Sequence, residues 1–146
     1  MRQKSDAQKY LEQVEKIDAI ITNKLIEKQQ WRDIAMGITA NMGGERVQSS
    51  GSASKMAEAI EKCVDMEAEI DRLVDKLIEI KKDVISTLEQ LESPADYRLL
   101  HDRYIKFMDL TTIAERWNRD YTTITTAHGR AIVEVQRILD KRNSQM

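Results

Sequence analysis

The stretch DLTTIAERWNRDYTTITTAHGRAI, from Asp109 to Ile132, decides the fold that this sequence predicts. Its five consecutive β-branched residues, 122–126, favour a strand by propensity, whereas most of the chain has the periodicity of helices. An edge strand is the alternative interpretation, but the sequence offers no partner strand nearby. We therefore expect two helices, one from about Leu110 to Trp117 and one that begins after Asp120.

Short polar residues stand where these two helices should begin and end. Asp109 and Asp120 are suitable N-caps, because a carboxylate can accept from the free N–H groups of the first turn. Asn118 tolerates the left-handed conformation that often ends a helix. The expected buried residues are Leu110, Ile113, Ala114, Trp117, Ile124, Ala127, Ala131, Val135 and Ile138. A short helix, a tight turn and a longer helix have the spacing of a helix-turn-helix.

Three more helices, one short and two long, are predicted ahead of this pair. The short one should run from Pro94 to Phe107 with Ser93 as its cap, and it should bury Leu99, Leu100 and Tyr104. The long ones should span about residues 6–36, after a cap at Ser5, and 54–91. The second has a heptad seam of Cys63, Met66, Ile70, Leu73, Leu77, Ile80, Val84 and Leu91, with Thr87 in a weak position. A wider stripe of Ile60, Val64, Val74, Ile78, Ile85 and Leu88 indicates more than one neighbour.

The segment NMGGERVQSSGSAS, residues 41–54, is the strongest linker signal, because it holds three Gly and four Ser. Ser52 or Ser54 should cap the helix that follows. Through this linker the first helix can fold back on the second, using Leu11, Val14, Ile17, Ile21 and Leu25. A second copy of the chain is the other candidate partner, so we expect a homodimer or higher oligomer through the long helix.

Composition supports an all-α protein. Of 146 residues, 41% are hydrophobic and 33% charged, and only one is Pro. We expect a helical hairpin or coiled coil over 1–93 and a helix-turn-helix domain over 94–146. Residues 95–146 hold nine Lys or Arg and seven Asp or Glu, so this mildly basic part is compatible with nucleic-acid contact.

Other functional classes have little support in the sequence. Cys63 is the only cysteine and lies on an apolar stripe, which predicts a small core residue. The chain has no apolar run of membrane-spanning length and no signal-peptide block, which predicts a cytoplasmic protein without a membrane partner. No catalytic triad pattern is present, and His101 and His128 lack companions at ligand spacing. We therefore expect no enzyme activity, metal, cofactor or small-molecule substrate.

Two segments resemble known families. LHDRYIKFMDLTTIAERWNRDYTTITTAHGRAI, residues 100–132, resembles region 4 of bacterial sigma factors in its Arg-Tyr, its Ile-Ala, its small polar turn and its Arg-Ala-Ile. ERVQSSGSASKMAEAIEK, residues 45–62, followed by a long charged helix, is similar to the ArpU- and RinA-type regulators of late phage genes. The resemblance implies a regulator that binds double-stranded DNA in a bacterial host cell, with RNA polymerase as a further partner. No counterpart of sigma region 2 is present, so the chain is not expected to open promoters alone.

The resemblance to sigma region 4 also assigns roles to single positions. The implied DNA-binding residues are Arg119, Tyr121, Thr122, Thr125, Thr126, His128 and Arg130. The Thr and Tyr positions match outward residues that meet bases or phosphates, His128 matches an outward polar position, and Arg130 matches a phosphate contact. Arg119 is equally compatible with a phosphate contact and with simple solvation. Sigma recognition helices are usually rich in Arg and Gln, so Thr and Tyr here imply weak binding per chain.

The sequence thus predicts a sequence-specific DNA-binding regulator of phage late genes. Five β-branched residues in a helix cost about 2–3 kcal/mol relative to Ala, which a merely structural helix would have no reason to accept. Thr offers a hydroxyl and a methyl group that can contact bases. The alternative is a coiled-coil protein-interaction module, for example one that binds RNA polymerase, without direct DNA contact.

Overall fold

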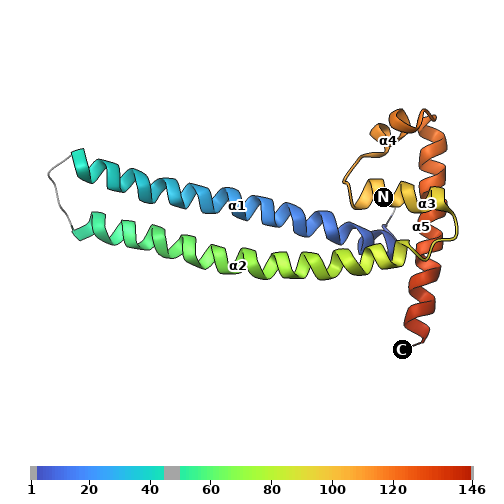
Figure 1. The fold of residues 1–146 in the computed structure, drawn as a ribbon, viewed down its shortest axis with the longest axis horizontal. Helices are drawn as coiled ribbons and strands as arrows, with labels where there is room; N and C mark the ends of the chain where they lie inside the picture. Colours follow the sequence, from blue (N-terminus) through green and yellow to red (C-terminus); the bar gives the residue numbers. More distant parts are fainter. Residues whose placement is uncertain (1–2, 45–49, 146) are drawn as a thin grey trace. The chain divides into compact units, whose positions relative to one another are not determined.

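The computed structural model describes the backbone of residues 3–44 and 50–145 and the side chains of residues 3–37 and 53–145. This part of the chain forms five helices and is all-α, as expected (Figure 1). The helices are α1 (Asp6–Gly44), α2 (Ser50–Leu88), α3 (Pro94–Tyr104), α4 (Leu110–Trp117) and α5 (Tyr121–Ser144). α1 and α2 form a long hairpin, and three shorter helices follow it.

Some helix ends agree with the sequence, and others differ from it. α4 has the expected bounds, and α5 is helical throughout 122–126, so the strand alternative is wrong. α3 ends at Tyr104, before the expected end at Phe107, whose backbone is left-handed with φ 59°. Residues 41–44 and 50–54 are helical, so the predicted linker was too long; its remaining part, 45–49, lies outside the described residues.

Two of the predicted helix caps are confirmed, and two are wrong. The Ser5 Oγ accepts from Gln8 N at 3.2 Å, and the Ser93 Oγ accepts from Asp96 N at 3.3 Å, which confirms both caps. The caps predicted at Ser52 and Ser54 were wrong, because both residues lie inside α2.

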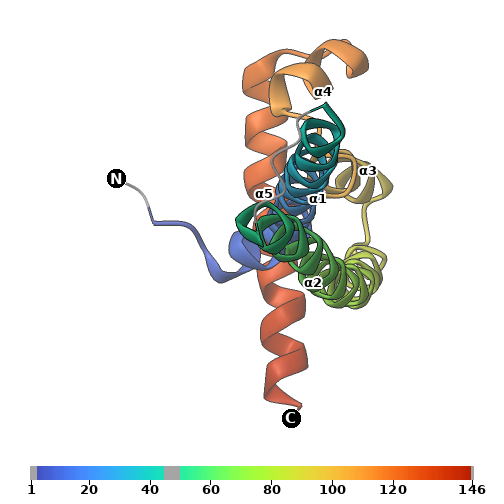
Figure 2. The ribbon, with the colours of Figure 1, turned by 90° about the vertical axis from the view of Figure 1, so that its left-hand side faces the viewer.

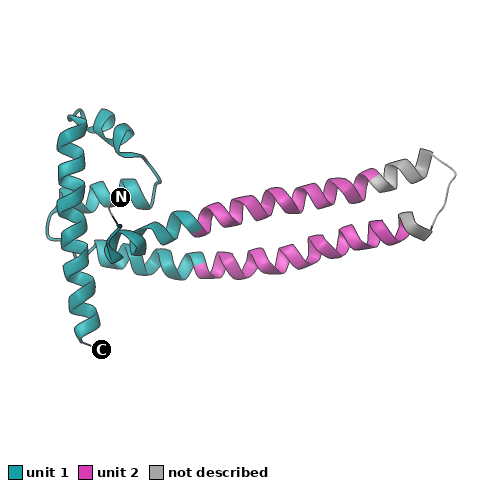
Figure 3. Cartoon of the chain, turned by 180° about the vertical axis from the view of Figure 1, so that it is seen from behind, with its two compact units in different colours: residues 1–16, 77–146 teal, residues 17–76 magenta. Residues whose placement is uncertain are grey.

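The chain divides into two compact units (Figure 3). Unit 1 comprises Met1–Lys16 and Leu77–Met146, and unit 2 comprises Ile17–Lys76. Neither border lies at 93/94, where the sequence suggested a domain boundary. The reason is packing, because the first turns of α1 and the last turns of α2 share an apolar core with the C-terminal helices.

Two apolar clusters hold unit 1 together. The larger joins α1, α2, α3 and α5 through Ala7, Leu11, Val14, Val84, Leu88, Leu100, Tyr104, Ile105, Ala131, Ile132, Val135 and Leu139. The smaller joins α3, α4 and α5 through Leu99, Ile113, Ala114 and Ile124, with Trp117 packed against it. α5 therefore has one buried side along much of its length, and α4 lies beside its N-terminal end (Figure 2).

Unit 2 is a two-helix segment with a narrow core. Ile17 and Ile21 of α1 and Ala59, Met66 and Ile70 of α2 are buried. Ion pairs flank this core, with Lys24 Nζ 2.8 Å from Glu69 Oε2 and Lys28 Nζ 3.2 Å from Glu67 Oε1. Exposed apolar residues on its surface include Leu25, Ile60, Val64 and Val74, so one part of the predicted wider stripe has no cover within the unit.

Two further predictions concern the seam and the membrane. Cys63 is partly buried, and its Sγ lies 3.7 Å from the Lys28 carbonyl oxygen as a donor, so its side chain is only partly in the core. Within residues 3–44 and 50–145, no helix has the length and apolar character needed to cross a membrane.

Candidate nucleic-acid interface

Local hydrogen bonds fix both ends of α4, at Asp109 before its first turn and at Asn118 in the turn that leads to α5. The Asp109 carboxylate accepts from Thr112 N at 2.7 Å, and these bonds to Thr112 lower the pKa of Asp109. Asn118 has φ 52° and ψ 50°, the left-handed conformation that the sequence predicted. That conformation lets Arg119 N reach back to the Ala114 carbonyl at 2.9 Å, which closes α4.

Asp120 starts α5 through its backbone. Its φ of −66° and ψ of 145° are extended, and its carbonyl oxygen accepts from Ile124 N at 3.1 Å. The Asp120 side chain makes no capping hydrogen bond, so the position of the predicted cap is right and its side-chain contact is absent. A groove of about 340 Å³ at this turn is lined by Thr111, Ala114, Glu115, Asn118, Arg119, Asp120 and Tyr121.

The buried side of α5 sets the direction of its exposed side. Ile124 is 2% exposed and packs in the cluster with Leu99 and Ile113. Trp117 packs against the same cluster, and the Arg98 guanidinium lies 4.7 Å from its ring centroid. The Trp117 Nε1 is buried, and nothing in the described part of the chain accepts its proton. As predicted, Ala131 and Val135 are buried further along the helix.

Four of the predicted DNA-binding residues of α5 are exposed. Tyr121, Thr122, Thr126 and Arg130 face solvent, and Tyr121 is 55% exposed. Arg119 is exposed in the turn. Because residues three and four apart lie on one side of a helix, a single exposed face results. It comprises Thr122, Thr126, Gly129, Arg130, Val133 and Arg137, and we call it the α5 outer face.

Thr125 and His128 lie apart from the α5 outer face. Thr125 is half-buried, and its hydroxyl donates to the Thr122 carbonyl at 3.0 Å. His128 contradicts the expectation of an outward position, because it is half-buried and its Nε2 lies 2.7 Å from the Tyr104 Oη. Its ring also stacks on the Tyr104 ring, at 5.7 Å between centroids. The physical reason is the helical period, which places His128 four residues after Ile124 on the buried side.

Burial and nearby charges set the protonation of this pair. Burial lowers the pKa of His128, the Arg103 guanidinium lowers it further, and Glu12 opposes them. Burial also raises the pKa of Tyr104 to about 12. Both side chains are therefore neutral at pH 7, and the Tyr104 hydroxyl remains protonated and able to donate.

The arginines on and near the α5 outer face differ in whether they are ion-paired. Arg137 pairs with Glu134 at 2.7 Å, and Arg142 pairs with Asp83 at 3.1 Å. Arg116, Arg119 and Arg130 are exposed and have no ion-pair partner among the residues that the structure describes. Arg116 was not predicted as a DNA-binding residue. Its position in the last helical turn of α4, directly before the predicted loop, could have indicated it.

Acidic residues also lie close to this surface. Glu115 in α4 and Asp120 in the turn are exposed, as is Asp109 at the start of α4. A groove of about 680 Å³ beside α5 brings Arg130 and Val133 near Glu92 and Asp96. The potential over this part of unit 1 is therefore mixed, with the free cations concentrated on α4, the turn and the middle of α5.

Comparisons with protein-family models, with curated proteins and with solved structures find no match for this chain. Among the described residues, no group of three or more His, Cys, Asp or Glu side chains could hold a metal ion.

Proposed function

We propose that this chain is a sequence-specific DNA-binding transcription regulator of phage origin, with a helix-turn-helix like that of sigma region 4. α4 and α5 are its two helices, and α5 enters the major groove. The observation that carries the proposal is the α5 outer face, where hydroxyls and an unpaired Arg130 are exposed on a helix whose opposite side is fixed by a buried core.

The chemistry of the exposed residues suits base recognition. The Thr122 and Thr126 hydroxyls can donate to or accept from base edges, and their methyl groups can pack on thymine. Thr125 offers mainly its methyl group, since its hydroxyl is bonded to the backbone of its own helix. Arg130 and Arg119 are placed to neutralise phosphates on either side of these threonines.

The small number of free cations limits the affinity of one chain. Each neutralised phosphate adds to a salt-dependent affinity, and three unpaired arginines supply only a few such contacts. A second copy of the chain or contact with RNA polymerase would raise the apparent affinity. By the resemblance stated above, the regulated promoters would be those of late phage genes in the cytoplasm of the bacterial host.

Selection of bound duplexes from a random DNA pool tests this function with the full chain. We expect enrichment of one motif, and a binding constant that falls steeply as salt rises. Thr126→Ala should change the enriched motif. Arg130→Ala should weaken binding to all duplexes alike and reduce the salt slope by about one.

Arg72→Ala is the matched control for Arg130→Ala. Arg72 is an exposed arginine in the middle of α2, in unit 2, and it has no ion pair among the described residues. Its loss should leave both affinity and motif unchanged. The DNA-binding proposal fails if the wild-type chain enriches no motif and binds no duplex at low salt.

A protein-interaction module is the second candidate, and a specific surface of unit 2 favours it. Met36, Ile60 and Val64 are exposed, and they line a groove of about 400 Å³ together with Met56 and Cys63. Exposed apolar patches of this kind often bind proteins. If Val64→Asp disrupts the association of two chains, or of the chain with RNA polymerase, and no DNA binding is found, this candidate replaces the first.

A further inference from the structure

Gly129 is an unusual residue for its position. It lies in the interior of α5, a helix of 24 residues, and apart from Pro it is the least favourable residue for a helix interior. It is exposed and lies on the α5 outer face, three residues after Thr126 and four before Val133. An Ala at this position would favour the helix, so the choice of Gly calls for a physical reason.

Among the residues that the structure describes, nothing requires a glycine there. The φ of Gly129 is not in the left-handed region, and a Cβ built on it would meet no atom within 4 Å. A side chain therefore fits the folded chain without strain or displacement. A glycine can also let another molecule approach the backbone closely, and Gly129, unlike Gly37, lies among exposed hydroxyls and unpaired arginines.

The surroundings of Gly129 indicate what that molecule is. Thr122 and Thr126 precede it on the same face. The exposed Arg130 next to it makes no ion pair in the described part of the chain, although Glu92 and Asp96 line the same groove. Arg119 supplies a second unpaired cation at the turn before α5. Exposed hydroxyls with free guanidinium groups suit a polyanion, because they bond to phosphate oxygens.

We propose that Gly129 is the point where α5 approaches DNA most closely. One sugar-phosphate strand of the groove wall passes over the bare backbone at Gly129, while Arg130 contacts the phosphate beside it. The inference rests on the proposed DNA binding and adds a residue that sets the depth at which α5 enters the groove. A methyl group at this position would hold the helix away from the strand and lengthen the contacts of the neighbouring residues.

Gly129→Ala tests the proposal, because fold stability and binding should change in opposite directions. The melting temperature should rise, since Ala is the better helix former and has open space. Affinity for the duplex that the wild-type chain selects should fall about tenfold, equivalent to about 1.4 kcal/mol. Gly129→Ser should show a similar loss of affinity, which separates the added bulk from the gain in helix propensity.

Gly37→Ala is the matched control. Gly37 is also an exposed glycine within a helix, α1, and a Cβ there meets nothing within 4 Å. Its replacement should raise the melting temperature and leave DNA affinity unchanged. If wild type and Gly129→Ala bind the selected duplex equally, the close approach is overturned and the proposed function stands. If the wild-type chain binds no duplex, both fail.

Discussion

The Tyr104 Oη lies 2.7 Å from the His128 Nε2, which bonds a fully buried side chain of α3 to the helix that carries the exposed threonines. Tyr104 is 1% exposed and belongs to the larger core cluster, whereas His128 is half-buried on α5. The pair is thus a polar connection between the core of unit 1 and the inner side of α5, opposite the α5 outer face. It fixes the rotation of α5 more narrowly than apolar contacts alone, because a hydrogen bond requires a defined direction.

Stability should fall as pH drops below about 6.5, the ordinary pKa of histidine. Burial holds the folded-state pKa of His128 below that value, so the unfolded chain binds more protons in the window between the two values. The stability supplied by neutral His128 is present above the unfolded pKa, falls as pH decreases through it, and stops falling below the folded pKa. Urea unfolding at pH 8, 6.5 and 5 measures this.

His128→Gln is the control for the pH prediction. Gln can still hydrogen-bond to Tyr104 but does not titrate. His101 also has a pKa lowered by burial, so some pH dependence in the same direction should remain in the variant. If the free energy of unfolding depends on pH equally in the wild-type chain and the variant, the pKa of His128 does not differ between the folded and unfolded chain.

Ile124→Ala should destabilise unit 1 by about 2–5 kcal/mol. Ile124 is 2% exposed and fills the cluster made by α3, α4 and α5, so truncation leaves a cavity there. Val133→Ala, at a residue that is 51% exposed on the same helix, should change stability by less than about 0.5 kcal/mol. Denaturant midpoints compare the two. Equal effects would mean that α5 is not held by this cluster.

Replacing Asn118 with Ala and with Gly should have different effects on the stability of the fold. Its φ of 52° is left-handed, which costs an L-residue without a short polar side chain about 1–2 kcal/mol. Asn118→Ala should therefore destabilise by about 1 kcal/mol, and Asn118→Gly should be neutral or stabilising. Thermal unfolding separates them. If Ala and Gly behave alike, the turn does not depend on the left-handed conformation.

The agreement between sequence and structure is closest where the signals are local. Asp109, Asn118 and Ser93 act within three or four residues of themselves, so their roles in the turn and caps followed from residue type and spacing. The long-range features did not follow. The resemblance to sigma region 4 assigns His128 an outward position, although its spacing of four from Ile124 indicates the inner side of α5. Only packing shows that Tyr104, 24 positions earlier in the chain, lies within hydrogen-bond distance of it.

In the hairpin, a local sequence signal predicted the wrong helix bounds. Gly and Ser in residues 41–54 are typical of a linker, yet helix extends to Gly44 and begins again at Ser50. The preference of Gly and Ser for turns and loops is outweighed there, because α1 and α2 continue into the segment from both sides. The division into units was also hidden, because nothing in the sequence of residues 1–16 indicates that Ala7, Leu11 and Val14 pack with α5.

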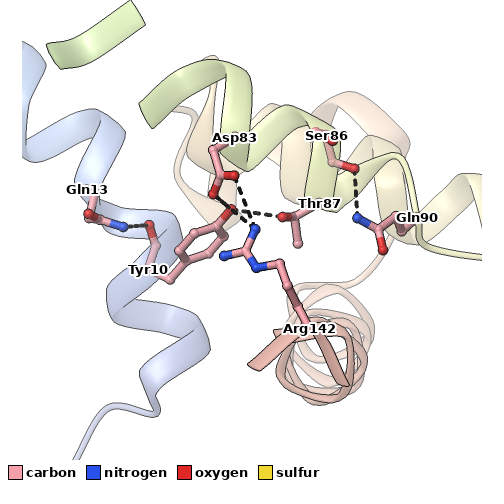
Figure 4. Close-up of polar contacts among 7 residues, drawn as sticks. All are labelled: Tyr10, Gln13, Asp83, Ser86, Thr87, Gln90 and Arg142. Carbon is pink, nitrogen blue, oxygen red and sulfur yellow. Dashed lines mark hydrogen bonds and ion pairs between the residues drawn. The ribbon is translucent and has the colours of Figure 1, made fainter. Parts of the chain in front are cut away.

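Thr87 is the clearest case of a sequence irregularity that the structure explains. It occupies the weak position of the predicted heptad seam and is 1% exposed. Its Oγ1 lies 2.8 Å from the Tyr10 Oη, which in turn donates to Asp83 Oδ2 at 2.5 Å (Figure 4). Arg142 of α5 bonds to the same carboxylate at 3.1 Å, so one small network connects α1, α2 and α5.

Tyr10→Phe and Thr87→Val should therefore show coupling in a double-mutant cycle. Tyr10→Phe leaves the buried Thr87 hydroxyl without its tyrosine partner and should cost about 1–3 kcal/mol. In the Thr87→Val background that hydroxyl is absent, so the same change should cost at least about 0.5 kcal/mol less. Tyr10→Phe combined with Ile124→Ala, whose residues share no cluster, should be additive within about 0.5 kcal/mol. Additivity in both pairs would mean that Thr87 is tolerated in the seam for its size alone, because a hydroxyl that bonds Tyr10 must make the two substitutions depend on each other.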